Sequence, residues 1–322
     1  MPLQAINNSV TVDLDSIYDL LFITGPTASG KTSLAVAIAK RVGGEIISAD
    51  SRQVYRGMEI GTGKDYEDYL TDGIRLPCHL IDIADPGYKY NVFEYQRDFI
   101  KVYSSLKERN VFPVVCGGSG MYAESIITGY KMFEVPPDSG LRAELQKKSM
   151  EELMKILSTY KNLHNITDLD TKSRVVRAIE IEHFNRNQRK QNSEMPKVDS
   201  LIVAVLFDRE SRRRRITERL KKRLDAGMID EVKHLIDKGI NTETLIYYGL
   251  EYKFITLFLT GKLTYEEMAR DLEIAIHQFA KRQMTWFRGM ERRGNKINWL
   301  DGNLPMEEKV ERVLELLTEK CS

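Results

Sequence analysis

Short apolar runs and helical periodicities alternate along much of this chain. Runs typical of buried strands occur at 20–23, 45–48, 79–83, 112–116 and 200–207. Between them, residues 33–40 and 91–109 carry apolar side chains at helical spacing, and Asn91 is the expected N-cap of the second helix. Strands that alternate with helices predict an α/β fold, a parallel sheet flanked by helices on both faces. The strand at 200–207 is expected to be the last strand of the core.

The pattern changes after Gly129, where a Pro-Pro pair interrupts it. One amphipathic helix is expected at 141–159 and another at 171–184. These features predict a small helical insertion domain, residues 131–195, within a core made of residues 1–130 and 196–322. Beyond residue 209 the pattern is mostly helical, with a short extended piece at 297–300.

The segment between the first strand and the first helix has the pattern G-x-x-x-x-G-K-[ST]. Backbone N–H groups of such a loop and the N-terminus of the following helix form a concavity that binds phosphate. The lysine adds a full positive charge, and the hydroxyl after it is a ligand for Mg²⁺. The alternative is a glycine-rich turn that binds no ligand, but strand, loop and helix together favour a P-loop NTPase-like phosphate site. The loop consists of Gly25, Pro26, Thr27, Ala28, Ser29, Gly30, Lys31 and Thr32.

Two further segments follow predicted strands and so belong to the edge of the sheet where ligands gather. Asp50 follows the second strand and is either an ordinary turn residue or a general base facing the phosphate site. The turn at 117–122 is rich in glycine. Its Ser119 could contact a phosphate or the acceptor, or the turn could merely require small residues.

The segment 209–223 carries nine basic residues against two acidic ones, although the whole chain has a formal net charge of only +1. Ile216, Leu220 and Leu224 recur every four residues, which predicts a helix with one buried stripe. Its basic remainder is either a solvated face or a contact for nucleic-acid or diphosphate groups. Two smaller basic groups on predicted helices, each more typical of ordinary surface, are Arg174 with Arg177 and Lys281-Arg282-Gln283.

Composition excludes several classes of protein. Charged residues make up 30% of the chain and hydrophobic residues 42%, as in soluble proteins. The three cysteines form neither a disulfide framework nor a metal-binding pattern. No apolar run approaches the length of a membrane span. We therefore expect a cytoplasmic protein without a membrane partner, and a monomer by default.

Seven motifs occur in one order over residues 20–300: GPTASGKT, DSRQVYRGMEIGTGK, HLIDI, CGGSGMY, RAIEI, RITERL and AKRQMTWFRG. Together they resemble the tRNA dimethylallyltransferases, also called tRNA isopentenyltransferases, of the bacterial type without a zinc finger. The sequence departs from the family's usual pattern at Gly63 and Asp65, at 168–170, and at Tyr248-Gly249-Leu250-Glu251.

The resemblance implies that a dimethylallyl group moves from dimethylallyl diphosphate to the exocyclic amine of the adenine beside the anticodon of a tRNA. It implies that the P-loop, Arg219 and Mg²⁺ hold the diphosphate, with Lys31 catalytic and Thr32 on the metal. Asp50 is then the general base, and the Ser119 hydroxyl replaces the threonine that contacts the acceptor. Residues assigned to the tRNA anticodon stem-loop are Asp50, Ser51, Arg52, Gln53, Ser119, Ser173, Arg174, Arg177, Lys281, Arg282 and Gln283.

Three other functions compete with this one. Enzymes related to this family prenylate free adenine nucleotides, and such an adenylate isopentenyltransferase needs neither a basic helix nor a helical insertion. The P-loop alone favours an ATP-binding small-molecule kinase or NTPase. An RNA-binding module with a vestigial loop is the non-catalytic alternative.

Overall fold

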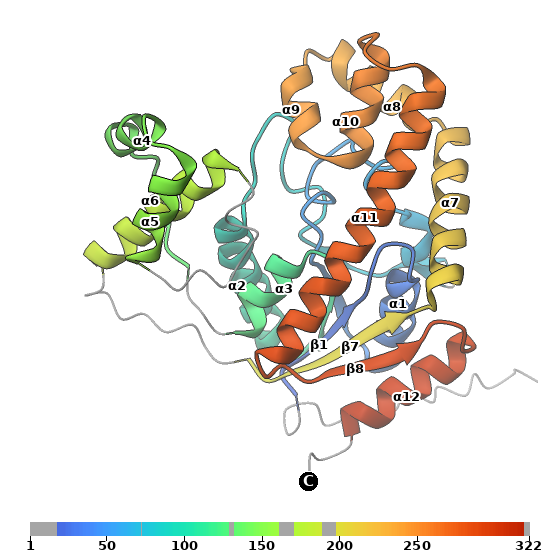
Figure 1. Ribbon diagram of the computed structural model, residues 1–322. Helices are drawn as coiled ribbons and strands as arrows, with labels where there is room; N and C mark the ends of the chain where they lie inside the picture. Colours follow the sequence, from blue (N-terminus) through green and yellow to red (C-terminus); the bar gives the residue numbers. More distant parts are fainter. Residues whose placement is uncertain (1–17, 72, 129–131, 161–170, 189–197, 319–322) are drawn as a thin grey trace, which may run out of the picture. The chain divides into compact units, whose positions relative to one another are not determined.

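The computed structural model describes residues 18–71, 73–128, 132–160, 171–188 and 198–318. The chain divides into two compact units, residues 1–129 with 197–322 and residues 130–196. Figure 1 draws the described residues of both units as ribbons. Each unit has a hydrophobic core of its own.

A parallel sheet is the centre of the first unit. Within the described residues it has six strands in the order β5-β2-β6-β1-β7-β8, and every pairing is parallel. The α/β class and the parallel sheet expected from the sequence are confirmed. The strands of this sheet are β1 (Leu20–Thr24), β2 (Glu45–Ser48), β5 (Cys78–His79), β6 (Pro113–Cys116), β7 (Ser200–Leu206) and β8 (Ile297–Asp301). A separate two-stranded ribbon is formed by β3 (Leu70–Thr71) and β4 (Ile74–Arg75).

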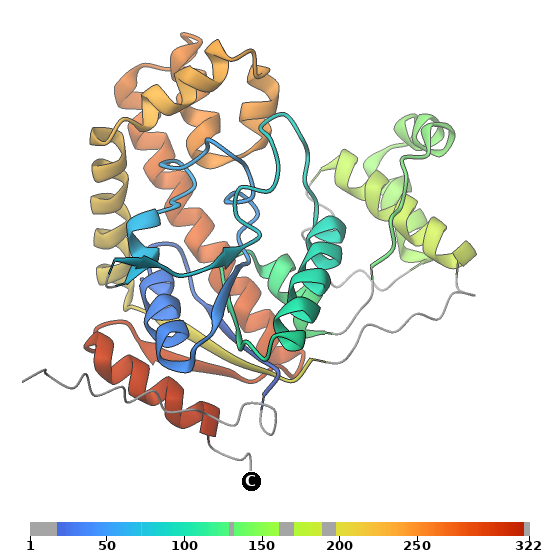
Figure 2. The ribbon, with the colours of Figure 1, turned by 180° about the vertical axis from the view of Figure 1, so that it is seen from behind.

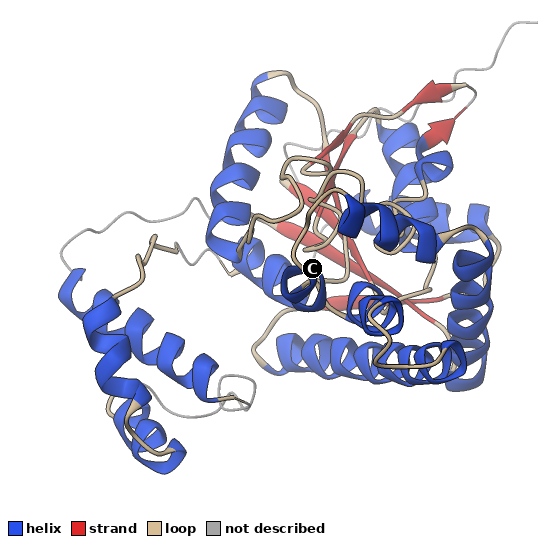
Figure 3. Ribbon diagram, turned by 90° about the horizontal axis from the view of Figure 1, so that it is seen from above, coloured by secondary structure: helices blue, strands red, loops and turns tan. Residues whose placement is uncertain are grey.

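Helices cover both faces of the sheet because side chains alternate along each strand. Leu20 and Phe22 of β1 belong to a core shared with α2 (Val92–Glu108), α3 (Gly120–Ile127) and α11 (Tyr265–Arg292). Leu21 and Ile23 belong to the opposite core, shared with α1 (Lys31–Val42) and α12 (Met306–Thr318). Figure 3 shows the strands lying between helices, as this alternation requires.

The remaining helices of this unit lie between β7 and α11 in the chain. They are α7 (Arg209–Asp225), α8 (Met228–Asp237), α9 (Thr242–Tyr247) and α10 (Leu250–Leu259). All of them contribute to the same core as α11. Among the described residues, no helix is both long and apolar enough to span a membrane. In Figures 1 and 2, α11 runs as one long helix across the unit and α7 lies upright beside it.

The strand at 200–207 is not the last strand of the core. β8 pairs with β7 along its whole length, from Ile202 with Ile297 to Leu206 with Asp301. The long helix α11 returns the chain across the sheet, so that β8 can add to its edge in parallel. The extended piece expected at 297–300 is therefore a strand of this sheet, and as an edge strand it is only partly buried.

The strand expected at 79–83 is too long, since β5 ends at His79. Leu80 and Asp82 both have positive φ values, 58° and 55°, which no strand accommodates. The chain leaves the sheet here, and the side chains of Lys64 and Tyr66 hold Asp82 in its new position.

The second unit contains three helices within its described residues: α4 (Ser139–Gln146), α5 (Met150–Ser158) and α6 (Lys172–Gln188). The single helix expected at 141–159 is wrong. Ser149 begins a new helix by forming a capping box with Glu152, so the chain turns between α4 and α5. Leu145 and Leu153 then pack with Val175 and Val176 of α6 in the core of this unit.

Candidate functional site

The P-loop has the backbone that its pattern predicts. Gly25 has φ 146°, and a Cβ there would lie 2.7 Å from the carbonyl oxygen of Val205. Ala28 and Gly30 adopt left-handed conformations, and Gly30 caps α1. The loop therefore curls over the N-terminus of α1, whose free N–H groups and dipole favour an anion. A cleft of about 290 Å³ lies against it, lined by Ala28, Ser29, Gly30, Lys31, Thr32, Ser33, Asp65, Asp68, Arg215, Glu218, Arg219 and Lys222.

One side of the basic helix α7 lies on the P-loop. Arg215 donates from Nε to the carbonyl oxygen of Ala28 at 3.0 Å, and its guanidinium lies 4.3 Å from the centre of the Phe207 ring. Arg219 donates a hydrogen bond to the Thr27 hydroxyl. Part of the charge of this helix is therefore directed at the phosphate site.

The positive charges of Lys31 and Arg219 are poorly compensated by the surrounding groups. Burial lowers the pKa of Lys31, and the neighbouring charge of Arg219 lowers it further. Burial and the charge of Arg223 lower the pKa of Arg219 to about 10. A lowered pKa means that the surroundings disfavour the positive charge, and a bound anion would reverse this. Arg223 has an acidic neighbour, because its guanidinium lies 3.6 Å from the Asp65 carboxylate.

A second cavity of about 80 Å³ brings Asp50 together with the P-loop. Asp50 follows β2, and its Oδ1 accepts a hydrogen bond from the Arg52 N–H at 2.8 Å. That bond is typical of a turn residue, yet the carboxylate also lines the cavity. The lining includes Thr27, Lys31, Thr32, Asp50, Gln53, Thr62, Gly63, Asp65, Gly117, Arg219, Phe279 and Gln283.

Ser119 contacts the segment that follows Asp50. It is the N-cap residue of α3, and its hydroxyl accepts a hydrogen bond from the Ser51 N–H at 3.0 Å. The turn also needs small residues, because a Cβ on Gly117 would lie 2.2 Å from the carbonyl oxygen of Ala49. The turn thus packs directly against the end of β2 and fixes the position of the segment that carries Asp50.

Gln283 is buried and connects the two loops of the site. Its Oε1 accepts a hydrogen bond from the Thr27 N–H, and its Nε2 donates to the carbonyl oxygen of Gly118, both at 2.9 Å. Its neighbours Lys281 and Arg282 are exposed on α11. The three residues are adjacent in the sequence, but only Gln283 is buried in the site, whereas Lys281 and Arg282 are exposed.

We expect Gln283→Ala to lower the free energy of unfolding by about 2 kcal/mol, since it leaves two backbone groups in the site without their partner. The KM for the phosphate-bearing substrate should rise as well, because the P-loop loses its tie to the neighbouring turn. Urea denaturation measures the first effect, and Lys281→Ala on the same helix is the stability control. Unchanged stability combined with weakened RNA binding alone would instead show Gln283 to be an RNA contact.

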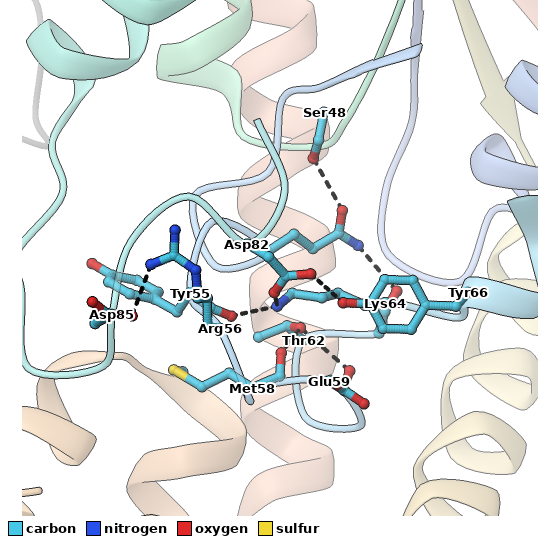
Figure 4. Close-up of polar contacts among 12 residues, drawn as sticks. Ser48, Tyr55, Arg56, Met58, Glu59, Thr62, Lys64, Tyr66, Asp82 and Asp85 are labelled. Carbon is cyan, nitrogen blue, oxygen red and sulfur yellow. Dashed lines mark hydrogen bonds and ion pairs between the residues drawn. The ribbon is translucent and has the colours of Figure 1, made fainter. Parts of the chain in front are cut away.

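The loop at 58–65 is held from two sides. The residues that hold it were not among the site residues predicted from the sequence. Figure 4 shows the buried Lys64 donating to the Asp82 carboxylate and to the carbonyl oxygen of Tyr55, while the Tyr66 hydroxyl donates to Asp82. Lys64 lies in the motif segment GTGK and Asp82 in the motif HLIDI. These motifs were the sequence signal by which the two residues could have been found.

Glu231 of α8 holds the other side of the same loop. Its carboxylate accepts hydrogen bonds from the N–H groups of Glu59 and Ile60 at 2.7 Å and of Gly61 at 3.0 Å. Glu231 lies in the sequence AGMIDEV, which follows the motif RITERL, but that sequence does not indicate which backbone groups the carboxylate binds.

Gln53 ties the loop to β2. It is buried, its Oε1 accepts from the Ser48 hydroxyl, and its Nε2 donates to the carbonyl oxygen of Gly63, both at 3.0 Å. A Cβ on Gly63 would lie 1.9 Å from the end of the Arg223 side chain, which would have to move, and the φ of 68° also favours glycine there.

In the second unit, Arg177 belongs to an ion cluster. Arg142 and Arg177 both bind the buried Glu180, and Arg177 also donates to the carbonyl oxygen of Val135 at 2.8 Å. Burial opposes the charge of Glu180, but the hydrogen bonds from the two arginines outweigh it and lower its pKa. Ser173 and Arg174 are exposed.

A curled loop over a helix N-terminus, with Lys31, Arg215 and Arg219 beside it and Asp50 in the adjoining cavity, is the arrangement of a P-loop protein, and such loops suit phosphate groups. Family models narrow this class: "IPP transferase" matches residues 53–290 and "Isopentenyl transferase" matches residues 18–82. The chain belongs to the IPP transferase family, and the resemblance drawn from the ordered motifs is confirmed.

The relatives by sequence are close in length to this chain. A protein of Bacteroides fragilis named "tRNA dimethylallyltransferase 2" is 59% identical over 302 residues, covering 94% of this chain and 99% of its own. A protein of Phocaeicola vulgatus with the same name is 58% identical over 303 residues, with the same coverage.

Solved structures share the fold. A full-length tRNA isopentenylpyrophosphate transferase from Bacillus halodurans is 31% identical, with a TM-score of 0.66 over 92% of this chain and 95% of its own. A eukaryotic dimethylallyltransferase described as acting on tRNA has a TM-score of 0.71 over 88% of this chain and 73% of its own. At 22% identity, the latter supports the fold alone.

Proposed function

We propose that this protein transfers a dimethylallyl group from dimethylallyl diphosphate to the exocyclic amine of the adenine beside the anticodon in tRNA. One observation carries the proposal: in a member of the IPP transferase family, Asp50 lines the same cavity as Lys31, Thr32 and Arg219. A carboxylate and a diphosphate-binding group within one cavity suit a reaction in which a nucleophile loses a proton while a diphosphate leaves.

In this mechanism the acceptor amine attacks the first carbon of the dimethylallyl group, and the bond from that carbon to the diphosphate oxygen breaks. The lone pair of an adenine amine is delocalised into the ring, so the amine is a weak nucleophile. Asp50 takes its proton as the new bond forms. Lys31, Arg219 and the N–H groups of the P-loop stabilise the negative charge that develops on the leaving diphosphate.

The residues of the cavity also suit Mg²⁺, which the family implies. The oxygen donors Thr32 and Asp65 line it, and Mg²⁺ prefers one or two carboxylates together with substrate phosphates. Bound there with Thr32 as a ligand, Mg²⁺ would neutralise charge on the diphosphate.

Contacts to the tRNA are assigned to residues on both units. In the first unit they are the segment Asp50–Gln53 with Ser119, and the exposed Lys281 and Arg282. In the second unit they are Ser173, Arg174 and Arg177. A monomer acting in the cytoplasm stays a prediction.

The test is incubation of the protein with unmodified tRNA and labelled dimethylallyl diphosphate, with and without EDTA. Label is expected in the tRNA, in the adenine beside the anticodon, and EDTA should suppress it. Label in AMP in preference to tRNA would establish adenylate prenylation instead. Phosphate transfer from ATP, without any prenyl transfer, would establish a kinase. RNA binding without either reaction would leave only a binding module.

A further inference from the structure

An exposed tyrosine stands beside the segment that carries Asp50. Tyr247 ends α9, and 51% of its surface is exposed. Its ring has two cations as neighbours: Lys89 Nζ lies 5.1 Å from the ring centre and the Arg52 guanidinium carbon 5.9 Å. An exposed aromatic ring flanked by cations is the combination that binds a nucleotide, because the base stacks on the ring and the phosphate meets the cations.

The position of Tyr247 is fixed by its neighbour Tyr248. The Tyr248 ring is buried and lies 4.4 Å from the Tyr55 ring, centre to centre. Its hydroxyl accepts from the Gly87 N–H at 2.6 Å and donates to the carbonyl oxygen of Tyr88 at 3.0 Å. Tyr248 thereby ties the end of α9 to the loop that carries Lys89.

The platform lies near the proposed general base. The Arg52 N–H donates to Asp50, while the Arg52 side chain reaches Tyr247. Arg52 therefore connects Asp50 with Tyr247 within the first unit.

We propose that Tyr247 is a stacking platform for an unpaired base of the tRNA anticodon loop next to the acceptor adenine, with Lys89 and Arg52 binding the flanking phosphates. This inference rests on the proposed function, since it names a contact of the same substrate. Tyr247 directly precedes the stretch Tyr248-Gly249-Leu250-Glu251, where this chain departs from the usual family pattern, and the proposal assigns it a specificity-determining role. Base stacking on an aromatic ring outweighs an exposed cation–π contact, so the base can replace a cation at the ring face.

The test compares Tyr247→Ala, Tyr247→Phe and the control Tyr265→Ala. Tyr265 is also an exposed tyrosine of the first unit, but it packs on Phe258. Tyr247→Ala should raise the KM for tRNA about tenfold and leave the KM for dimethylallyl diphosphate unchanged. Tyr247→Phe keeps the ring and should behave like the unchanged protein, as should Tyr265→Ala.

A binding experiment separates this inference from the proposed function. The probe is a synthetic anticodon stem-loop RNA with 2-aminopurine beside the acceptor adenine, whose fluorescence falls on stacking. Quenching by the unchanged protein that is lost in Tyr247→Ala supports the inference, even where no prenyl transfer occurs. Equal quenching by both proteins, or a KM for tRNA that Tyr247→Ala leaves unchanged, would overturn it.

A charge variant tests the phosphate contact. Lys89→Gln should lower the slope of log affinity against log salt concentration by about 1, because one fewer phosphate is neutralised. An unchanged slope would remove Lys89 from the RNA contact.

Discussion

Asp50→Asn is expected to lower kcat for prenyl transfer about a thousandfold, which is within the range of a lost general base. The asparagine keeps the shape of the side chain and an oxygen that can accept from the Arg52 N–H, so the turn after β2 should stay intact. What it loses is the ability to take the proton from the acceptor amine. Transfer of label into tRNA under saturating substrates measures the effect.

The affinity for the diphosphate separates a catalytic from a structural role of Asp50. Inhibition by inorganic pyrophosphate should change little in Asp50→Asn, because the N–H groups of the P-loop, Lys31 and Arg219 remain. The control is Asp85→Asn, an exposed carboxylate paired with Arg56 outside the cavity. A large loss of pyrophosphate binding in Asp50→Asn, with kcat retained, would contradict the proposed role.

Arg219→Gln is expected to lower kcat/KM for dimethylallyl diphosphate by about a hundredfold and to weaken inhibition by pyrophosphate. Arg219 contacts the P-loop at Thr27 and faces both cavities of the site. Its positive charge is disfavoured by burial and by Arg223, which lowers its pKa to about 10. An anion bound in the cavity would compensate that charge.

Arg219→Gln should not destabilise the fold. Since the folded protein disfavours the charge of Arg219, its replacement by a neutral side chain should leave the Tm unchanged or raise it slightly. Arg213→Gln removes the same charge from an exposed position of α7 and should leave kcat/KM nearly unchanged. A Tm that falls sharply in Arg219→Gln would show that this arginine supports the fold rather than the substrate.

Features that depend on a few consecutive residues could be predicted from the sequence. The P-loop is one, because its eight residues alone determine the curled backbone and the helix start at Lys31. The capping box of Asn91 is another. Long apolar strands such as β7 were predictable for the same reason. The break between α4 and α5 was also local, but helical periodicity on both sides of Ser149 concealed it.

Features that depend on residues far apart in the chain were settled only by the tertiary structure. Gln283 is separated from Thr27 by 256 positions, yet its amide joins the P-loop to the turn at Gly118. Glu231 reaches the N–H of Ile60 across 171 positions. The edge position of β8 likewise depended on the return of the chain through α11.

The sequence by itself determined the family, the phosphate loop and the strand after which Asp50 stands, since each is encoded by adjacent residues. The tertiary structure decided which of the many basic residues serve the site. Arg215 and Arg219 contact the P-loop, Arg223 lies beside Asp65, and Arg177 binds Glu180 in another unit. The physical reason is that a charged side chain acquires its role from the groups that surround it, and packing between distant segments brings those groups together.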